Sequence, residues 1–168
     1  MKPSDLKLSL RERRAVLGTM VSMCRSPDIM LLLARCGMDF ALIDTEHGAF
    51  GTETVADLCR VARASDLTAI LRVAGRGPAY VSRSLDIGAD GVMMPRVELP
   101  SEAEDALRWA KYAPLGNRGV ALGGAGGDYR PVDDARAVMT QANASTVIVI
   151  QIESQDACLL YTSPSPRD

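Results

Sequence analysis

The residues best suited to chemistry follow a short apolar run in the first third of the chain. The segment FALIDTEHGAF, residues 40–50, places four apolar residues before Asp44, Glu46 and His47, and His47 is the only histidine. An apolar run that ends in ionisable groups and a glycine is typical of a buried strand entering a polar loop. Because the ordinary pKa of histidine lies nearest neutrality, His47 is a candidate general base or metal-linked proton carrier. The alternative is a solvated histidine in an ordinary acidic loop.

Other polar side chains stand at corresponding places farther along the chain. They are Arg72 within a third apolar segment, Arg96 and Glu98 after a fourth, and Gln151 and Glu153 at the end of a fifth. In a parallel barrel the carboxyl ends of the strands meet on one face, where catalytic groups from several strands lie together. The distribution therefore predicts a single polar site assembled from several strands.

The segments that would position these groups alternate between two periodicities. Uniformly apolar runs predict strands over 15–22, from residue 40, and over 68–73, 91–95 and 146–152. Helical spacing predicts three helices over 27–36, 78–87 and 131–142. A fourth helix is expected to be capped by Thr52. A fifth is expected to begin at a capping box of Ser101 and Glu104 and to end before Pro114. The expected inward residues are Val55, Leu58, Cys59 and Ala62 in one helix, and Ala103, Ala106, Leu107 and Ala110 in another.

Five alternations of an apolar strand with a helix predict an α/β fold with a parallel sheet. The competing architecture is a doubly wound open sheet, but no G-x-G-x-x-G motif follows the first strand. A closed (β/α)8 barrel has eight such units and about 250 residues. We therefore expect a partial TIM (β/α)8 barrel made of about its first five βα units.

Composition excludes several classes of function. The 19 basic and 21 acidic residues give a net charge of −2 without a basic block, so neither nucleic acid nor an anionic membrane is an expected partner. No run approaches the roughly 20 apolar residues of a membrane helix, and the N-terminus is polar, so we expect a cytoplasmic protein. The cysteines have no C-x-x-C spacing, and Cys24, Cys36 and Cys59 lie in apolar patterns, which favours buried free thiols.

The last eleven residues differ in character from the rest. The segment CLLYTSPSPRD, residues 158–168, continues no strand or helix period, and it can be back-translated into the start of a widely used transposase-type sequencing adapter. We interpret it as an adapter read-through tail, with a genuine Pro/Ser-rich tail as the alternative. Residues 1–157 are then expected to form a truncated TIM-barrel domain.

Several segments in the same order resemble the HpcH/HpaI aldolase family. They are LIDTEHGAF, the arginine of ILRV, ADGVMMPRVELPSEAEDALRWAKYAPLGNRGV and IVIQIES, and the resemblance covers about residues 15–157. Members of this family are metal-dependent class II aldolases that cleave 2-keto-3-deoxy sugar acids and related 2-keto acids to pyruvate and an aldehyde. The resemblance therefore implies a carbon–carbon lyase, with the second carboxylate ligand of its metal beyond this chain and with a homo-oligomeric parent protein.

The resemblance also implies roles for individual residues. His47 would be the general acid/base with Asp44 as its support, and Arg72 would contact the ketone or enolate oxygen of pyruvate. Gln151 would line the substrate pocket, and Glu153 would be a ligand of the divalent metal. Oxygen ligands without cysteine favour Mg, Mn or Co over structural zinc. The non-catalytic alternatives are an ion pair with a barrel acid for Arg72 and a strand-end salt bridge for Glu153.

Two other functions remain open from the sequence. A citrate-lyase or malyl-CoA-lyase type enzyme would share the barrel but should carry basic residues for the CoA phosphates, and no such cluster is evident. The second open possibility is a catalytically dead fragment that lacks the second metal ligand. The segment GGAGG, residues 123–127, is interpreted as a flexible active-site or interface loop, because no P-loop lysine follows it.

Overall fold

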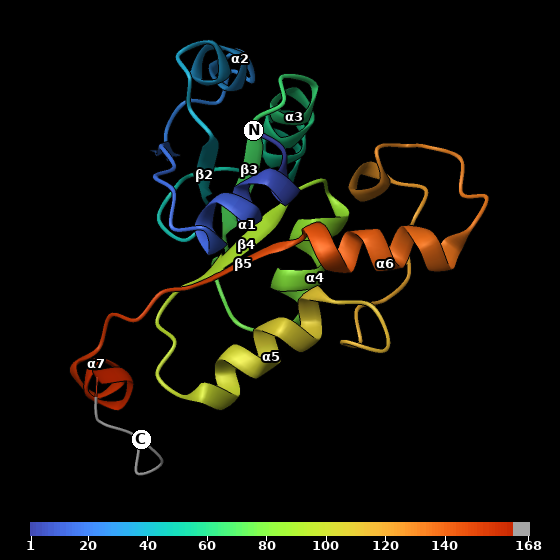
Figure 1. Cartoon of the computed structure of the whole chain (residues 1–168). Helices are drawn as coiled ribbons and strands as arrows, with labels where there is room; N and C mark the ends of the chain where they lie inside the picture. The colour runs from blue at the N-terminus through green and yellow to red at the C-terminus, as the bar shows by residue number, and fades with distance from the viewer. Residues whose placement is uncertain (163–168) are drawn as a thin grey trace.

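The computed structural model describes residues 1–162, which alternate strands and helices from end to end (Figure 1). The helices are α1 (Pro3–Arg11), α2 (Asp28–Arg35), α3 (Thr52–Ala64), α4 (Pro78–Asp86), α5 (Pro100–Ala110), the 3-10 turn η1 (Ala125–Gly127), α6 (Ala135–Ser145) and α7 (Gln155–Thr162). The strands are β1 (Gly18–Val21), β2 (Phe40–Asp44), β3 (Thr68–Arg72), β4 (Gly91–Met94) and β5 (Val147–Ile150).

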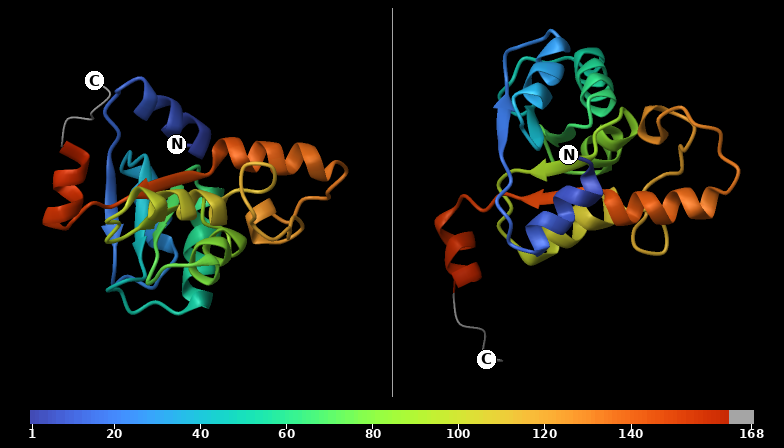
Figure 2. Two further views of the ribbon diagram at one scale, coloured as in Figure 1. Left: turned by 90° about the horizontal axis from the view of Figure 1, so that it is seen from below. Right: turned by 45° about the horizontal axis from the view of Figure 1, so that its top comes forward.

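The strands form one sheet of 5 strands in the order β1-β2-β3-β4-β5, and every neighbouring pair is parallel. Consecutive strands are therefore neighbours in space, and each helix between them returns the chain to the start of the next strand. Helices α2 and α3 pack against β2 and β3, and helices α4 and α5 pack against β4 and β5, so that the helices follow the curve of the sheet (Figure 2). This arrangement confirms the predicted succession of five βα units and not a doubly wound sheet, in which the strand order would reverse.

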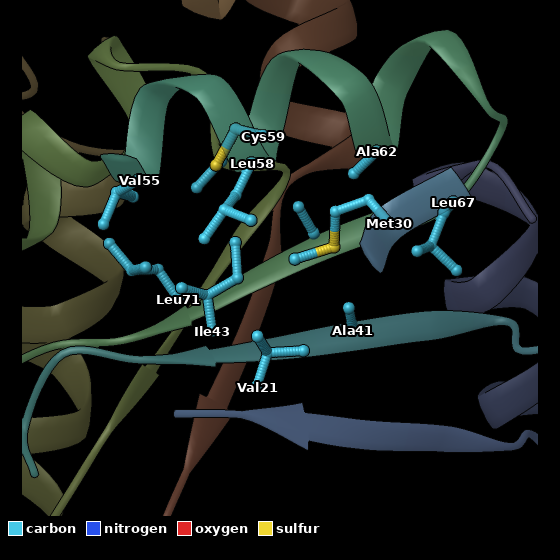
Figure 3. Packing of buried hydrophobic residues seen from close by; sticks show 12 residues of the cluster. Val21, Met30, Ala41, Ile43, Val55, Leu58, Cys59, Ala62, Leu67 and Leu71 are labelled. Carbon is cyan, nitrogen blue, oxygen red and sulfur yellow. The ribbon is translucent and has the colours of Figure 1, made fainter. Parts of the chain in front are cut away.

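The main core lies between the sheet and the helices α2 and α3 (Figure 3). The sheet contributes Ala41, Ile43 and Leu71, and α2 contributes Met30, all of them buried. The four residues of α3 that the helical spacing predicts to face inward are buried here as well: Val55, Leu58, Cys59 and Ala62. Burial of such side chains, at about 1.5–3 kcal/mol each, is what fixes the helices on this face.

The opposite face of the sheet is covered at the amino ends of its strands by α1, a helix absent from the elements that the sequence predicts. Leu6 of α1 is buried against Leu42, Ile70 and Val147, whose side chains point away from α2 and α3. Leu42 and Ile43 are neighbours in β2 that face opposite sides, and both are buried. Two buried faces explain why the strand sequences are uniformly apolar rather than alternating.

Three sequence-based details of the helices are wrong. Helix α5 begins at Pro100, one residue before the predicted cap, so Glu102 rather than Glu104 accepts the backbone N–H groups of Glu98 and Leu99. Leu107, expected to face inward, is exposed. The other misplaced cap is Thr52, which is the first residue of α3 and not its cap.

Helix α6 is also displaced from its predicted span over 131–142. It begins only at Ala135, because the carboxylate of Asp134 accepts the N–H of Ala137 at 3.0 Å and so caps the helix there. The helix then continues to Ser145 and enters β5 almost directly.

The prediction of buried thiols holds for one of the three cysteines on which it rests. Cys59 is buried, and burial raises its pKa to about 12, so it is a packing residue and not a nucleophile. Cys24 and Cys36 are exposed, because Cys24 lies in the loop between β1 and α2 and Cys36 directly follows the last residue of α2.

Helix α7 occupies a stretch where the sequence predicts no regular element after residue 157. Figures 1 and 2 show it apart from the sheet, beyond the end of β5. Residues 163–168 of the expected tail lie outside the described residues, and the origin of residues 158–168 stays a prediction. Within residues 1–162, none of the helices has the length and apolar character needed to cross a membrane.

The two-sided packing of β2 leads to a stability prediction. Ile43→Ala should lower the free energy of unfolding by about 2–5 kcal/mol, because a fully buried side chain leaves a cavity between β2 and α3. Leu31→Ala in α2, where the side chain is 42% exposed, is the control and should cost less than about 0.5 kcal/mol. Urea-induced unfolding followed by circular dichroism measures both, and equal effects of the two variants would contradict the described core.

Candidate functional site

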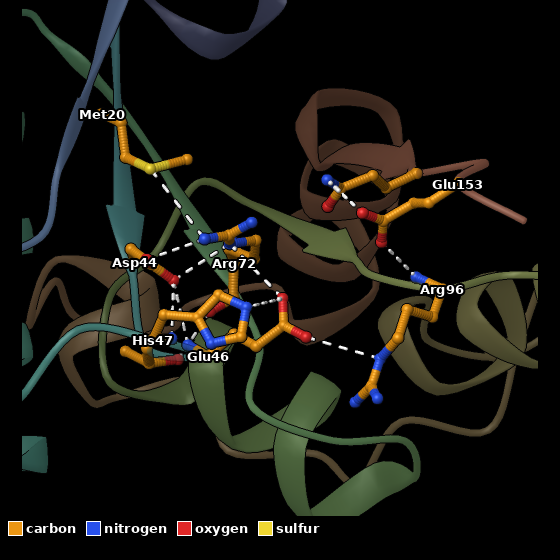
Figure 4. Close-up of polar contacts among 9 residues, drawn as sticks. Met20, Asp44, Glu46, His47, Arg72, Arg96 and Glu153 are labelled. Atoms are coloured by element: carbon orange, nitrogen blue, oxygen red, sulfur yellow. Dashed lines mark hydrogen bonds and ion pairs between the residues drawn. The ribbon is translucent and has the colours of Figure 1, made fainter.

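The site begins with two charged residues that end neighbouring strands. Asp44 is the last residue of β2 and Arg72 the last of β3, and the parallel register pairs them directly. Arg72 donates from Nε to Oδ1 of Asp44 at 2.9 Å and from Nη2 to Oδ2 at 2.7 Å (Figure 4). Their side chains are only 11% and 3% exposed. A fork of two parallel charge-assisted bonds fixes the guanidinium in one plane.

This pairing changes the acidity of both partners. The hydrogen bonds from Arg72, together with those from the backbone of the following loop, hold the pKa of Asp44 below its ordinary value despite burial. The pKa of Arg72 is raised by its hydrogen bonds to Asp44, with smaller contributions from the charges of Asp44, Glu46 and Glu153. Both groups are therefore charged throughout the physiological range.

The loop after β2 is held by the same carboxylate. Oδ1 of Asp44 accepts the backbone N–H of Glu46 at 3.0 Å and that of His47 at 3.2 Å, which is the way an Asp side chain stabilises a turn. Gly48 is required next, because a Cβ at that position would lie 2.1 Å from the carbonyl oxygen of Asp44. The turn leaves the imidazole of His47 73% exposed. Asp44 thus supports the backbone of His47, and its carboxylate makes no hydrogen bond to the imidazole.

Glu46 lies at the centre of the charged groups. Its side chain is only 8% exposed, and Oε2 lies 3.8 Å from Nε2 of His47 and 3.6 Å from Nε of Arg72. Its other oxygen, Oε1, lies 3.5 Å from Nε of Arg96, as Figure 4 shows. One carboxylate therefore faces three basic side chains, from the ends of β2, β3 and β4. Glu46 received no role from the sequence, although its place between Asp44 and His47 is the signal that could have indicated one.

The end of β5 brings Glu153 to the same face. Oε1 of Glu153 accepts the backbone N–H of Arg96 at 2.9 Å, and Oε2 accepts Nε2 of Gln151 at 3.1 Å. Arg96 adopts a left-handed backbone conformation with φ of 51°, which is uncommon for a residue with a side chain. Glu153 thus makes these two hydrogen bonds and, among the described residues, no salt bridge, unlike the non-catalytic alternative that the sequence allows.

The structure brings all the predicted site residues to one end of the sheet. Asp44, His47 and Arg72 are in direct contact or linked through Glu46, and Gln151 contacts Glu153. Arg72 is in an ion pair with a barrel acid, the alternative that the sequence leaves open for it. Its hydrogen bonds to the described residues engage Nε and Nη2, so they leave Nη1 available.

Among the described residues, no group of three or more His, Cys, Asp or Glu side chains is arranged to hold a metal ion. Glu153 is the residue of this chain to which the family resemblance assigns a metal-ligating carboxylate. The described residues therefore supply one ligand of a metal centre and not a complete one.

A pocket of about 460 Å³ opens beside the imidazole of His47. The loops after β1 and β2 enclose it, and its lining consists of Met20, Ser22, Met23, Arg25, Asp44, His47, Ala49 and Phe50. Arg25 is a second lining residue that received no role from the sequence. Its signal would have been a charged side chain just after a strand, the same kind of position that points to Arg96.

A larger pocket of about 790 Å³ lies at the opposite end of the sheet, with no predicted catalytic residue in its lining. Gly126 and Gly127 line it together with Leu67, which immediately precedes β3, and Asp90, which immediately precedes β4. The segment 123–127 is therefore at the amino ends of the strands, and its interpretation as an active-site loop is wrong for this chain. The η1 turn is held there because the carbonyl of Ala125 accepts a hydrogen bond from Arg63.

Comparison with known proteins agrees with this geometry. The profile of the HpcH/HpaI aldolase/citrate lyase family matches residues 19–160. The chain belongs to this family. It is 35% identical over 159 residues to a 4-hydroxy-2-oxovalerate aldolase of Novosphingobium aromaticivorans, covering 92% of this chain and 57% of the relative. It is 29% identical over 153 residues to a 5-keto-4-deoxy-D-glucarate aldolase of Salmonella arizonae, covering 91% of this chain and 58% of the relative.

A solved member of the HpcH/HpaI family has the same fold. The crystal structure of an HpcH/HpaI aldolase from Desulfitobacterium hafniense DCB-2 superposes with a TM-score of 0.84 and 36% identity, over 90% of this chain and 58% of that one. Family membership and the partial-barrel prediction are thereby confirmed. The chain spans a little under three fifths of the length of these relatives.

The ion pair between Asp44 and Arg72 leads to a prediction about stability and pH. Asp44→Asn should lower the free energy of unfolding by about 3–5 kcal/mol near neutral pH, because it leaves a buried guanidinium without its counter-charge. The folded-state pKa of Asp44 is lowered, so this stabilisation is complete above the ordinary value of about 3.9 and is lost as the pH falls through the lowered pKa. The difference between variant and wild type should therefore narrow below about pH 4.

Urea unfolding at a series of pH values measures this difference. Asp57→Asn is the matched control, because the ion pair of Asp57 with Arg60 in α3 is exposed and should contribute less than about 1 kcal/mol. A pH-independent difference for Asp44→Asn, or one no larger than that of the control, would contradict the role assigned to the pair.

Proposed function

We propose that the whole protein is a divalent-metal-dependent aldolase that makes or cleaves the carbon–carbon bond between pyruvate and an aldehyde. The observation that carries this proposal is the juxtaposition of an exposed imidazole, His47, with a fixed guanidinium, Arg72, at the carboxyl ends of neighbouring strands. The names of the two curated relatives support it, since 4-hydroxy-2-oxovalerate and 5-keto-4-deoxy-D-glucarate are both substrates of aldol cleavage. We also propose a cytoplasmic homo-oligomer, following the family resemblance.

Cleavage needs a base near the hydroxyl group of the substrate and positive charge near its keto group. In our proposal the imidazole of His47 accepts the proton of the 4-hydroxyl group, the bond between C3 and C4 breaks, and C4 leaves as the aldehyde carbon. The electron pair of that bond moves to the 2-keto oxygen and forms an enolate, and C3 then takes up a proton to give pyruvate. In the synthetic direction the same steps run in reverse.

Arg72 is suited to the enolate because its position does not depend on the substrate. The Asp44 carboxylate holds Nε and Nη2, and Nη1 is free to donate to the oxygen on which negative charge develops. A donor that is already oriented stabilises the transition state without a further cost of reorganisation. A divalent cation with Glu153 among its ligands would supply additional positive charge at the same oxygen when bound.

The role of His47 can be tested directly. Tests of this proposal use a polypeptide of the relatives' full length that carries residues 1–157 unchanged, called the full-length enzyme below. His47→Ala should lower kcat for aldol cleavage by about 100-fold or more, which is the usual contribution of a positioned acid or base. Its free energy of unfolding should change by less than about 0.5 kcal/mol, because the imidazole is 73% exposed. Near-normal turnover of the variant would exclude His47 as the base.

Glu153 and Arg72 should affect the full-length enzyme in different ways. Glu153→Gln keeps the size of the side chain and removes its charge, so the affinity for Mn²⁺ should fall by at least about tenfold. Arg72→Lys should leave that affinity in place and lower kcat, because an ammonium group cannot hold Asp44 with one edge and face the enolate with another. Mn²⁺ titration and steady-state kinetics separate the two effects, and unchanged metal affinity and rate in both variants would place the site elsewhere.

A further inference from the structure

The pocket beside His47 has a chemical character of its own. Its lining includes the apolar side chains of Met20, Met23 and Phe50 together with the imidazole of His47. Arg25 is the arginine in this lining, and it forms no ion pair with Asp44, whose carboxylate is held by Arg72. A concave site with an apolar wall and a few polar groups is typical of small-molecule binding.

The charge of Arg25 is not compensated within the described part of the chain. Nη2 of Arg25 donates to the carbonyl oxygen of Ala49 at 3.1 Å, and no carboxylate of residues 1–162 forms an ion pair with it. The other arginines of the site differ in this respect, because Arg72 is paired with Asp44 and Arg96 faces Glu46. An arginine that faces only a carbonyl keeps its full charge and most of its five donors for a ligand.

The hydrogen bond of Arg25 to Ala49 fixes where that charge lies. Ala49 is two residues after His47, so the bond to its carbonyl connects the loop after β1 with the loop that carries the imidazole. Arg25 and His47 thereby border the same pocket from two different loops. A ligand whose carbonyl group meets His47 would extend into the reach of Arg25.

We infer that Arg25 is a specificity-determining residue that selects an aldehyde bearing a carboxylate. This inference rests on the proposed aldolase function and concerns the second substrate, not pyruvate. His47 acts on the aldehyde oxygen, and the guanidinium of Arg25 binds the remote carboxylate through parallel hydrogen bonds, the geometry for which arginine is suited. A neutral aldehyde of the same length would leave the charge of Arg25 without a partner, so it would be the poorer substrate.

A matched pair of substrates tests this selection in the full-length enzyme. With saturating pyruvate, kcat/KM is measured for 4-oxobutanoate, which carries a carboxylate, and for butanal, which has the same chain length without one. Arg25→Ala should lower kcat/KM for 4-oxobutanoate by about 10- to 100-fold, the range for a hydrogen bond to a charged group, and should change that for butanal by less than about threefold. Arg25→Lys retains the charge and should recover part of the loss.

Arg35→Ala is the matched control. Arg35 is an exposed arginine in the last turn of α2, so its removal changes the net charge equally but at the opposite end of that helix from the pocket. This variant should leave the preference between the two aldehydes unchanged. An equal loss for both aldehydes in Arg25→Ala would show that Arg25 only holds the loop through Ala49, and would overturn the inference. An unchanged preference between the two aldehydes in Arg25→Ala would also overturn the inference.

A binding measurement separates this inference from the proposed function. Calorimetric titration of butanoate into the full-length enzyme with saturating pyruvate requires no turnover, because butanoate has no aldehyde. The wild type should bind butanoate, and Arg25→Ala should bind it at least about tenfold more weakly. If this difference is found but no aldol product forms with either aldehyde, the aldolase proposal fails and the anion pocket stands. If the wild type binds no butanoate, or the variant binds it equally well, the inference is wrong.

Discussion

The bidentate pair of Asp44 and Arg72 is the interaction on which the candidate site depends. It joins two neighbouring strands at their last paired residues, where the apolar core ends and the polar loops begin. The same Oδ1 that receives Nε of Arg72 also receives the N–H groups of Glu46 and His47. One carboxylate therefore orients the guanidinium and shapes the turn that presents the imidazole, so the two candidate catalytic groups are positioned relative to each other by a single side chain.

The two ends of the sheet are chemically different for a physical reason. At the amino ends, Leu6 of α1 fills the space against Leu42, Ile70 and Val147 and leaves an apolar interior. At the carboxyl ends, the peptide N–H groups of the loops and the basic side chains can satisfy carboxylates such as Asp44 and Glu153. Burying a charge without such partners costs several kcal/mol. The carboxylates of the candidate site therefore depend on these N–H groups and basic side chains for their stability as charged groups.

The strands, most of the helices and the end of the sheet that carries the site could be predicted from the sequence, because they follow from periodicity and from polar residues at strand ends. Features that depend on distant contacts could not be predicted. Helix α1 has a polar sequence, and only Leu6 packing on three strands makes it part of the core. The exposed positions of Cys36 and Leu107 follow from where α2 ends and from which face α5 turns outward, and local apolar patterns do not determine either.

The roles of the individual charges were the least predictable part of the site, because they depend on which partner each charge finds in three dimensions. Arg72 and Arg96 look alike in the sequence, each at the end of an apolar strand, yet Arg72 is buried in a fork with Asp44 and the side chain of Arg96 is 69% exposed beside Glu46. The buried carboxylates of Asp44 and Glu46 face basic partners and hold the framework in place, whereas the buried Arg72 keeps Nη1 outside its bonds to Asp44. His47 and Arg25 retain the most exposed surface, so in our proposal an incoming molecule meets two exposed groups and one nitrogen of a fixed, buried guanidinium.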